Sequence, residues 1–372
     1  MNDVQRVLLF GGTGAVGASC LDLLTKSGDM SLLIAGRDEA RLREVASTVH
    51  ADVEIIRVDV ADVPAVSAAV AHCDVVINCA GPSQCHSDQV AAAAIAAGVP
   101  YVDPGGDHAL LGRLAAACTG VPVVLQAGVQ PGLSGLLLRV LALHRSDKID
   151  DVTAWCGGLQ HLTAASVLEY AASLRDTDSH PGAVLRDGVI RRIGHDELKS
   201  PPTQYFPGSV TARPHLDAET VAVAAHLGVG NVCWMNVFDG VHTTLAMQQL
   251  AVDGDRRGGE ADLGDVLTAA KLDLFGRQQY FAIVATARGL AGSTTVAFTC
   301  PDSYRVTGAL VAFAAQRVAG LPAGARAFWS IDEPQRALEF VTEVVPEAEA
   351  TLVDDSMVGA LDQRQMIEEG SL

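Results

Sequence analysis

This 372-residue sequence lacks long apolar runs, CxxC cysteine pairs and a net positive charge. No stretch holds 18 uninterrupted apolar residues, and the most apolar window, 121–143, contains two prolines, two glutamines and an arginine. We therefore expect no membrane-spanning helix. The N-terminus has no basic flank before a long apolar segment, so we expect no signal peptide. The formal net charge is −18, which repels phosphate backbones, and no nucleic-acid partner is expected.

The eight cysteines contain no CxxC pair, and no group of Cys, His and carboxylates has the spacing of zinc ligands. We expect no metal, reduced thiols and a cytoplasmic location. Lysine is scarce as well, because the chain has only Lys26, Lys148, Lys199 and Lys271. None of them stands four residues after a tyrosine. This excludes the Tyr-x-x-x-Lys pair of short-chain dehydrogenases, in which the lysine lowers the pKa of the tyrosine for proton transfer.

What the sequence does contain is a large apolar fraction, 49%, with a mean hydropathy of +0.25, which indicates a soluble protein with a sizeable core. Its first 125 residues alternate strand-like and helix-like runs, the pattern of βαβ units and a parallel sheet. The expected strands are 6–10, 31–35, 54–58, 74–78, 101–103 and 121–125. The expected helices are 15–25, 39–49, 63–71, 87–97 and 108–117.

Four glycines separate the first strand from the first helix in VLLFGGTGAVG (7–17). The motif Gly12-x-Gly14-x-x-Gly17 matches the dinucleotide fingerprint, and it stands where that fingerprint requires, between a strand and a helix. We expect Gly12 to permit the tight turn, Gly14 to let the backbone approach a pyrophosphate, and Gly17 to let the helix pack closely. The N–H groups at the start of the helix would hold the phosphates. The alternative is a turn with no ligand.

The end of the second strand indicates which dinucleotide is bound. Folds specific for NAD usually place Asp or Glu there to bind the ribose 2′-hydroxyl, whereas this strand ends in Gly36-Arg37. The Arg37 guanidinium can bind a 2′-phosphate, so NADP(H) is the expected cofactor, and Arg41 or Arg43 could assist. The alternative is a solvated arginine. The full set of expected cofactor-binding residues is Gly11, Gly12, Thr13, Gly14, Ala15, Val16, Gly17, Arg37, Asp59, Asn78, Ala80, Gly81 and Pro82.

The middle of the chain has a different pattern. Residues 152–156, 232–238, 280–288 and 294–300 favour strands, residues 164–174 and 306–318 favour helices, and Asp187-Gly188 favours a hairpin turn. Ser166-x-x-Glu169 has the form of a capping box for the first of these helices. The Pro-rich segment 196–217 favours a long loop.

These patterns predict an α/β protein with two domains. A Rossmann-type doubly wound parallel sheet occupies 1–128 and is completed by a helical return over 303–345. A mixed α+β domain with an antiparallel sheet occupies 129–302, after the Gly/Pro-rich segment 127–135. The acidic segment 346–372 is expected to be a solvated tail or a docked helix.

Four segments resemble the saccharopine dehydrogenase-like family. They are VLLFGGTGAVG with IAGRDEARL (34–42), VINCAGPSQCHSDQVAAAAIAAGVPYVDPGGD (76–107), VQPGLSGLL (129–137) and PDSYRVTGALVAFAAQRV (301–318). The resemblance implies NADP-linked reduction of an imine formed from an amine and a carbonyl, or the reverse oxidation. Other members of the family act on other C=N or C=C bonds, and the resemblance is loose over 150–300.

Hydride transfer also needs a shaped, dry site and a group that manages a proton. Asp103 and His108 flank the turn after the fifth strand, although Asp107 could simply cap the next helix. Gln130 stands at the domain boundary, His161 lies in the loop GGLQHLT, and Tyr170 lies one turn into the next helix. The expected catalytic residues are Asp103, His108, Gln130, His161 and Tyr170. Arg213 and Arg277 could bind a substrate carboxylate.

The function that these observations favour is NADPH-dependent reduction, at a C=N bond, of a small substrate that could be amino-acid-like. An enoyl or keto reductase of the same fold and a non-catalytic NADP-binding protein are the alternatives. We expect a homodimer, because an antiparallel sheet in a second domain often pairs across a dimer, and we expect no membrane partner.

Overall fold

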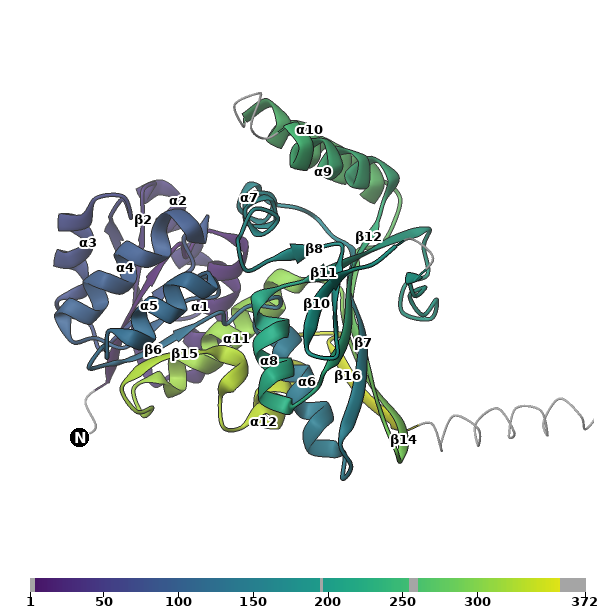
Figure 1. Cartoon of the computed structure of the whole chain (residues 1–372). Helices are drawn as coiled ribbons and strands as arrows, with labels where there is room; N and C mark the ends of the chain where they lie inside the picture. Colours follow the sequence, from purple (N-terminus) through teal and green to yellow (C-terminus); the bar gives the residue numbers. More distant parts are fainter. Residues whose placement is uncertain (1–3, 195–196, 254–259, 355–372) are drawn as a thin grey trace, which may run out of the picture. The chain divides into compact units, whose positions relative to one another are not determined.

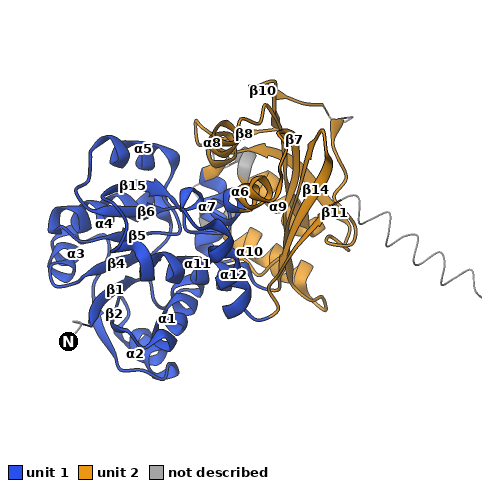
Figure 2. Cartoon of the chain, turned by 90° about the horizontal axis from the view of Figure 1, so that it is seen from below, with its two compact units in different colours: residues 1–136, 163–172, 302–346 blue, residues 137–162, 173–301, 347–372 orange. Residues whose placement is uncertain are grey.

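The computed structural model describes residues 4–194, 197–253 and 260–354 (Figure 1). Contacts divide the chain into two compact units (Figure 2). Unit 1 comprises residues 1–136, 163–172 and 302–346, and unit 2 comprises residues 137–162, 173–301 and 347–372. Both units are therefore assembled from segments that lie far apart in the sequence.

Unit 1 is built on a seven-stranded sheet with the order β15-β6-β5-β4-β1-β2-β3, in which every pairing is parallel. Its strands are β1 (Gln5–Phe10), β2 (Met30–Gly36), β3 (Val53–Arg57), β4 (Val75–Asn78), β5 (Tyr101–Val102), β6 (Pro122–Leu125) and β15 (Gly324–Ala327). The first six lie within one residue of the bounds that the sequence predicts. Their order is that of the Rossmann fold, and β15 extends the sheet beyond β6.

Helices cover both faces of this sheet. The helices of unit 1 are α1 (Ala15–Ser27), α2 (Glu39–Thr48), α3 (Val63–Val70), α4 (Ser83–Ala97), α5 (His108–Ala116), α7 (Ala164–Ser173), α11 (Ser303–Val318) and α12 (Pro334–Val344). Apolar residues of α3, α4 and α5 pack on one face in a single core cluster. On the other face α11 contacts β4, β5 and β6 and packs against α1. Burial on both faces explains why the strands read as continuous apolar runs.

Unit 2 contains a nine-stranded mixed sheet with the main order β10-β9-β12-β7-β13-β14-β16, and β11 pairs with β12 and β8. Its strands are β7 (Ile149–Leu159), β8 (His180–Pro181), β9 (Ala183–Arg186), β10 (Val189–Arg192), β11 (Val210–Leu216), β12 (Asn231–Asp239), β13 (Tyr280–Gly289), β14 (Gly292–Cys300) and β16 (Glu349–Asp354). The pair β7–β12 is parallel and the other pairs are antiparallel. The expected mixed α+β fold is confirmed.

Helices α8 (Ala218–Leu227), α9 (Val241–Asp253) and α10 (Glu260–Leu274) also belong to unit 2, together with the end of α6 (Leu133–His144). Helices α9 and α10 lie side by side (Figure 1). The expected hairpin is present, because Asp187 and Gly188 take φ values of 50° and 74° between β9 and β10. No helix in the described part of the chain combines the length and the apolarity that crossing a membrane requires.

The expected loop over 196–217 is wrong for residues 210–216, which form β11. Pro214 lies within this strand opposite Met235 of β12, and its carbonyl accepts from the Gly182 N–H at 2.8 Å. A proline removes only its own N–H donor from a strand, so the Pro-rich composition of the segment did not exclude a strand there.

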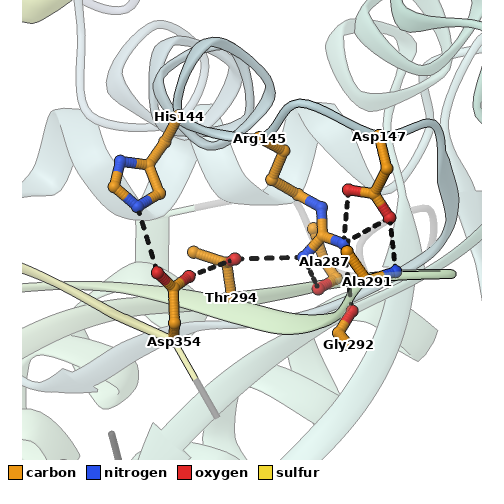
Figure 3. Close-up of polar contacts among 8 residues, drawn as sticks. All are labelled: His144, Arg145, Asp147, Ala287, Ala291, Gly292, Thr294 and Asp354. Carbon is orange, nitrogen blue, oxygen red and sulfur yellow. Dashed lines mark hydrogen bonds and ion pairs between the residues drawn. The ribbon is translucent and has the colours of Figure 1, made fainter. Parts of the chain in front are cut away.

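The acidic segment after Val345 also differs from expectation, because residues 349–354 are neither a solvated tail nor a helix but strand β16, paired with β14. Side chains of unit 2 hold its end in place (Figure 3). The Thr294 hydroxyl donates to Asp354 at 2.6 Å, and Arg145 donates to Thr294 at 3.0 Å and pairs with Asp147 at 2.7 Å. These partners are distant in sequence, which is why local composition did not reveal the strand. Residues 355–372 lie outside the described residues.

Candidate functional site

The turn between β1 and α1 is shaped by glycine, but not in the manner expected. The left-handed residue is Gly11, with φ 74°, and a Cβ added there would lie 2.5 Å from the carbonyl carbon and oxygen of Cys79. A Cβ on Gly12 would meet only side chains, those of Ile34 at 3.2 Å and Leu9 at 3.6 Å. The assignment of the tight turn to Gly12 is therefore corrected to Gly11, because only the latter needs a positive φ.

The next two glycines have separate reasons to lack a side chain. A Cβ on Gly17 would lie 2.2 Å from the carbonyl oxygen of Gly11, so helix α1 packs against the turn itself. A Cβ on Gly14 would meet only that same oxygen, at 3.3 Å. The fold thus demands glycine strictly at Gly11 and Gly17. At Gly14 it leaves open space beside the helix terminus, which is the space that a pyrophosphate would need.

The N-terminus of α1 also differs from most others in the chain. Aspartates accept backbone N–H bonds at the start of five helices, namely Asp38 for α2, Asp62 for α3, Asp107 for α5, Asp217 for α8 and Asp302 for α11. Helix α1 has no side-chain cap, and its first turn contains no acidic residue. Its first N–H groups and the positive end of its dipole are therefore available to an anion, and the turn fits a dinucleotide pyrophosphate.

Arg37 follows β2 and has an exposed side chain with no acidic partner among the residues that the structure describes. The Arg57 side chain, from the end of β3, donates from Nε to the carbonyl of Arg37 at 3.2 Å. The Arg57 guanidinium thus lies beside the backbone of Arg37, at the end of β2 where a 2′-phosphate would be bound. Of the expected assistants, Arg43 is paired with Glu39, and Arg41 is exposed on α2. Arg57 was missed because its position beside Arg37 depends on the pairing of β2 with β3.

The other expected cofactor residues lie at the carboxyl edge of the same sheet. Asp59 is exposed, and its carboxylate accepts from the Ala61 N–H at 3.0 Å, which stabilises its own turn. Asn78 is buried, and its Oδ1 accepts from the Ala80 N–H at 3.2 Å. Ala80, Gly81 and Pro82 follow as the loop that leads into α4.

Asp103, at the end of β5, is buried, and its oxygens already have partners. Oδ2 accepts from Asn78 Nδ2 at 2.9 Å and from the Tyr101 hydroxyl at 2.6 Å, and Oδ1 accepts from the Gly105 N–H at 2.7 Å. Burial raises the pKa of Asp103, and the bonds from Tyr101 and Asn78 oppose that rise. Burial likewise raises the pKa of the Tyr101 hydroxyl well above its ordinary value. This cluster ties the ends of β4 and β5 together.

The other expected catalytic residues are not all brought together. His108 is the exposed first residue of α5, and Asp107 caps that helix by accepting from the Leu110 N–H at 2.6 Å. Gln130 is partly buried in unit 1, and Tyr170 lies on α7, which is counted with unit 1. His161 is exposed and belongs to unit 2. The structure therefore gathers Asp103, His108, Gln130 and Tyr170 into one unit and His161 into the other.

Helix α7 reveals a residue whose role the sequence misassigned. The capping box is formed by Thr163 and Ser166, each backbone N–H donating to the other's hydroxyl at 3.0 and 3.1 Å. Tyr304 of α11 donates to the Ser166 hydroxyl at 2.9 Å. Glu169, expected in that box, instead accepts from the backbone N–H and, at 2.8 Å, from the hydroxyl of Ser83. The expected Ser166-x-x-Glu169 box is wrong because Glu169 has a partner 86 residues away.

Two further expectations concern metals and substrate arginines. Within residues 4–194, 197–253 and 260–354 no group of His, Cys, Asp and Glu side chains could hold a metal ion.

The Arg277 guanidinium forms an ion pair with the buried Asp239 carboxylate, with 2.7 Å between nitrogen and oxygen. The same carboxylate also accepts from the Tyr280 hydroxyl at 2.8 Å. Arg213 is exposed in β11. Arg277 is thus a partner of Asp239 and not a free cation.

Comparison with known proteins agrees with this geometry. Residues 7–127 match the family of the saccharopine dehydrogenase NADP-binding domain. A protein of Caenorhabditis elegans, described as a lipid droplet localized protein, is 29% identical over 118 residues, which are 29% of this chain and 28% of that protein. The chain thus matches less than a third of that relative's length. Among solved structures, apo saccharopine dehydrogenase (L-Glu forming) from Saccharomyces cerevisiae is 17% identical, with a TM-score of 0.68 over 94% of this chain and 100% of that one.

The family match covers the glycine turn, Arg37 and the β4 and β5 loops, and the structural match extends the shared fold over both units. Residues 7–127 are therefore a saccharopine dehydrogenase NADP-binding domain, NADP(H) is its cofactor, and the chain has the fold of the saccharopine dehydrogenase-like oxidoreductases.

Proposed function

We propose that this chain is an NADPH-dependent oxidoreductase that reduces a C=N bond formed from an amine, such as an amino acid, and a carbonyl compound, or catalyses the reverse oxidation. The observation that carries the proposal is that two comparisons agree. Residues 7–127 match the saccharopine dehydrogenase NADP-binding domain, and 94% of the chain matches the fold of a saccharopine dehydrogenase. A shared Rossmann domain alone would fit many reductases, whereas the second unit narrows the choice.

We assign the following roles to residues of this chain. The open N-terminus of α1 binds the pyrophosphate, and Arg37 with Arg57 binds the 2′-phosphate. Bound NADPH supplies the hydride for the carbon of the C=N bond. The rigid cluster around Asp103 fixes the loops after β4 and β5, where Ala80, Gly81 and Pro82 would face the cofactor. His108, Gln130, His161 and Tyr170 stay candidates for contact with the substrate.

The experiment is a screen of amine and carbonyl pairs and cyclic imines, following NADPH absorbance and identifying the product by mass spectrometry. Imine reduction predicts NADPH consumption only when both the amine and the carbonyl are present, and a secondary amine as product. Consumption with a carbonyl or enoyl compound alone would replace the proposal with a keto or enoyl reductase. Tight NADPH binding without turnover of any substrate would favour a non-catalytic NADP-binding protein.

We further propose that the protein is a cytoplasmic homodimer. All eight cysteines are free thiols, which supports a reducing compartment. Sedimentation equilibrium tests the assembly, since a mass of one chain at micromolar concentration would contradict it. Fluorescence microscopy of the tagged chain tests the location, and accumulation on lipid droplets, as the description of the worm relative suggests for that protein, would replace the cytoplasmic proposal.

A further inference from the structure

Helix α4 begins directly after the loop that follows β4, and it lacks a cap of its own. Its N-cap residue is Pro82, which has no side-chain acceptor. The first residue of the helix, Ser83, instead meets the Glu169 carboxylate of α7, with the Ser83 N–H donating to Oε1 and the Ser83 hydroxyl donating to Oε2 at 2.8 Å. A carboxylate from a distant helix thus fills the anion site at the start of α4.

This pair lies at the edge of the sheet where a dinucleotide binds. In sheets of this strand order the ligand lies across the carboxyl ends of the strands, at the switch between β1 and β4. Ser83 follows β4, and a Cβ added to Gly105, which follows β5, would lie 2.4 Å from the Cβ of Ser83. A Cβ added to Gly81 would lie 3.9 Å from Oε1 of Glu169. The Ser83–Glu169 pair therefore lies next to the carboxyl ends of β4 and β5. The α1 turn, in contrast, follows β1, on the other side of the point where the strand order reverses.

The surroundings of Glu169 suit a group that exchanges a proton. Burial raises the pKa of its carboxyl, the two bonds from Ser83 lower it, and the negative charge of Asp103 raises it further. Asp103 is the charged group that faces it from the β5 loop, Ser83 faces it from α4, and Tyr304 of α11 contacts Ser166 one turn earlier on α7. No cation of the described residues pairs with Glu169.

We propose that Ser83 and Glu169 form the proton relay of the reaction, with Ser83 as the residue that touches the substrate nitrogen. When Glu169 is ionised, the Ser83 hydroxyl donates to it, as in the structure. When Glu169 is protonated, its O–H donates to Ser83 Oγ, and the Ser83 hydrogen is released toward the substrate. The inference rests on the proposed function.

The step balances in atoms and charge. The imine carbon gains a hydride from NADPH, the π-electron pair of the C=N bond moves to nitrogen, and nitrogen takes the proton of Ser83. Ser83 takes the proton of the Glu169 carboxyl, and Glu169 is reprotonated from water. One imine, one NADPH and one proton yield one amine and one NADP⁺, and the reverse oxidation returns the proton by the same path.

The test compares the wild type with Glu169→Gln, Ser83→Ala and Asp88→Asn. Glu169→Gln keeps an acceptor for Ser83 but cannot exchange a proton, and Ser83→Ala keeps the backbone bond but loses the hydroxyl. Asp88 lies exposed on the same helix and pairs with Arg113, so Asp88→Asn is the control. We expect kcat to fall about 100-fold in the first two variants, and the pH dependence of kcat/KM that belongs to this group to disappear. NADPH affinity should stay within about twofold of the wild type in all three, because the α1 turn is untouched.

A second readout needs no turnover. A carboxyl whose pKa is raised in the folded state makes the protein less stable as the pH rises from the unfolded to the folded pKa, since the native state then binds more protons. Thermal unfolding of the apoprotein should therefore show a loss of stability with rising pH in the wild type and Asp88→Asn that is smaller in Glu169→Gln. If Glu169→Gln keeps the wild-type pH profile of kcat/KM or the wild-type pH dependence of Tm, Glu169 is only a helix cap and the relay is overturned. An absence of turnover in the wild type would reject the proposed function, and the Tm comparison would still decide whether Glu169 holds a proton.

Discussion

Helices α1 and α4 of unit 1 both begin at the carboxyl edge of the parallel sheet, and neither has a side-chain cap from its own N-cap residue. They differ in what meets the first N–H groups. At α4 the position is filled by the Glu169 carboxylate, whereas at α1 three glycines keep side chains away and no acidic residue lies in the first turn. The comparison shows that one kind of helix terminus can either hold an internal carboxyl or stay open, and that the neighbouring side chains decide which.

The largest expected effect comes from making α1 resemble the helices that have aspartate caps. Gly14 has an extended conformation, φ −83° and ψ 167°, in which Asp can cap. Gly14→Asp should change stability by only about a few tenths of a kcal/mol. The new carboxylate should repel a phosphate about 4 Å away by about 4 kcal/mol, which lowers NADPH affinity by several hundred-fold.

Fluorescence titration with NADPH measures this change, and circular dichroism checks that the variant folds. Gly14→Ala is the matched control, because it adds the Cβ without the charge and should lose much less affinity. Normal NADPH binding by Gly14→Asp would contradict the assignment of the α1 terminus to the pyrophosphate.

A second change disrupts the turn without adding charge. In Gly17→Ala the new Cβ would overlap the Gly11 carbonyl oxygen, so the backbone of the turn must move by about an ångström. A displaced turn no longer points its N–H groups at the pyrophosphate, and losing about 3 kcal/mol of charge-assisted hydrogen bonding should lower NADPH affinity about 100-fold. The control is Gly112→Ala on α5, where an added Cβ meets nothing within 4 Å. Equal affinities in the two variants would mean that the shape of this turn does not matter for binding.

The third prediction separates the pyrophosphate from the 2′-phosphate. Arg37→Ala should lower NADPH affinity about 10- to 100-fold and leave NADH affinity unchanged, because only NADPH carries the 2′-phosphate. Arg43→Ala serves as the control, since Arg43 is paired with Glu39. A parallel loss of NADPH and NADH affinity in Arg37→Ala would make Arg37 a structural residue.

The smallest effect is expected where the cap is conventional. Asp107→Ala removes the acceptor for the Leu110 N–H at the start of α5 and should destabilise the protein by about 1 kcal/mol. NADPH affinity should not change, since this helix terminus carries its own cap. A drop in NADPH affinity without a drop in Tm would instead place Asp107 in the binding site.

Local patterns predicted the strands and most helices of unit 1, because each βαβ unit is formed by a contiguous segment of the sequence. The glycine motif and Arg37 can also be recognised in contiguous sequence, since the motif lies in the turn after β1 and Arg37 lies in the turn after β2. Arg57, Glu169 and strand β16 were not predicted in their roles, because each acts through a partner that only the folded chain brings near. Glu169 illustrates the limit, since its spacing from Ser166 matched a capping box while its partner was Ser83.

Signals for the missed features were present but weak. Pro82 before Ser83 marks a helix start without a capping side chain, which implies that another group must satisfy the first N–H. Thr351, Leu352 and Val353 favour a strand, but the surrounding acidic residues suggested a solvated tail. The tertiary bonds of Thr294 and Arg145 decide the outcome there.

The most direct measurement is a side-by-side titration of the purified wild-type protein with NADPH and NADH, followed by intrinsic and nucleotide fluorescence. The account predicts saturable NADPH binding with an affinity at least about 10-fold higher than that for NADH, since the glycine turn serves both and Arg37 only one. Binding of neither nucleotide, or equal binding of both, would contradict it.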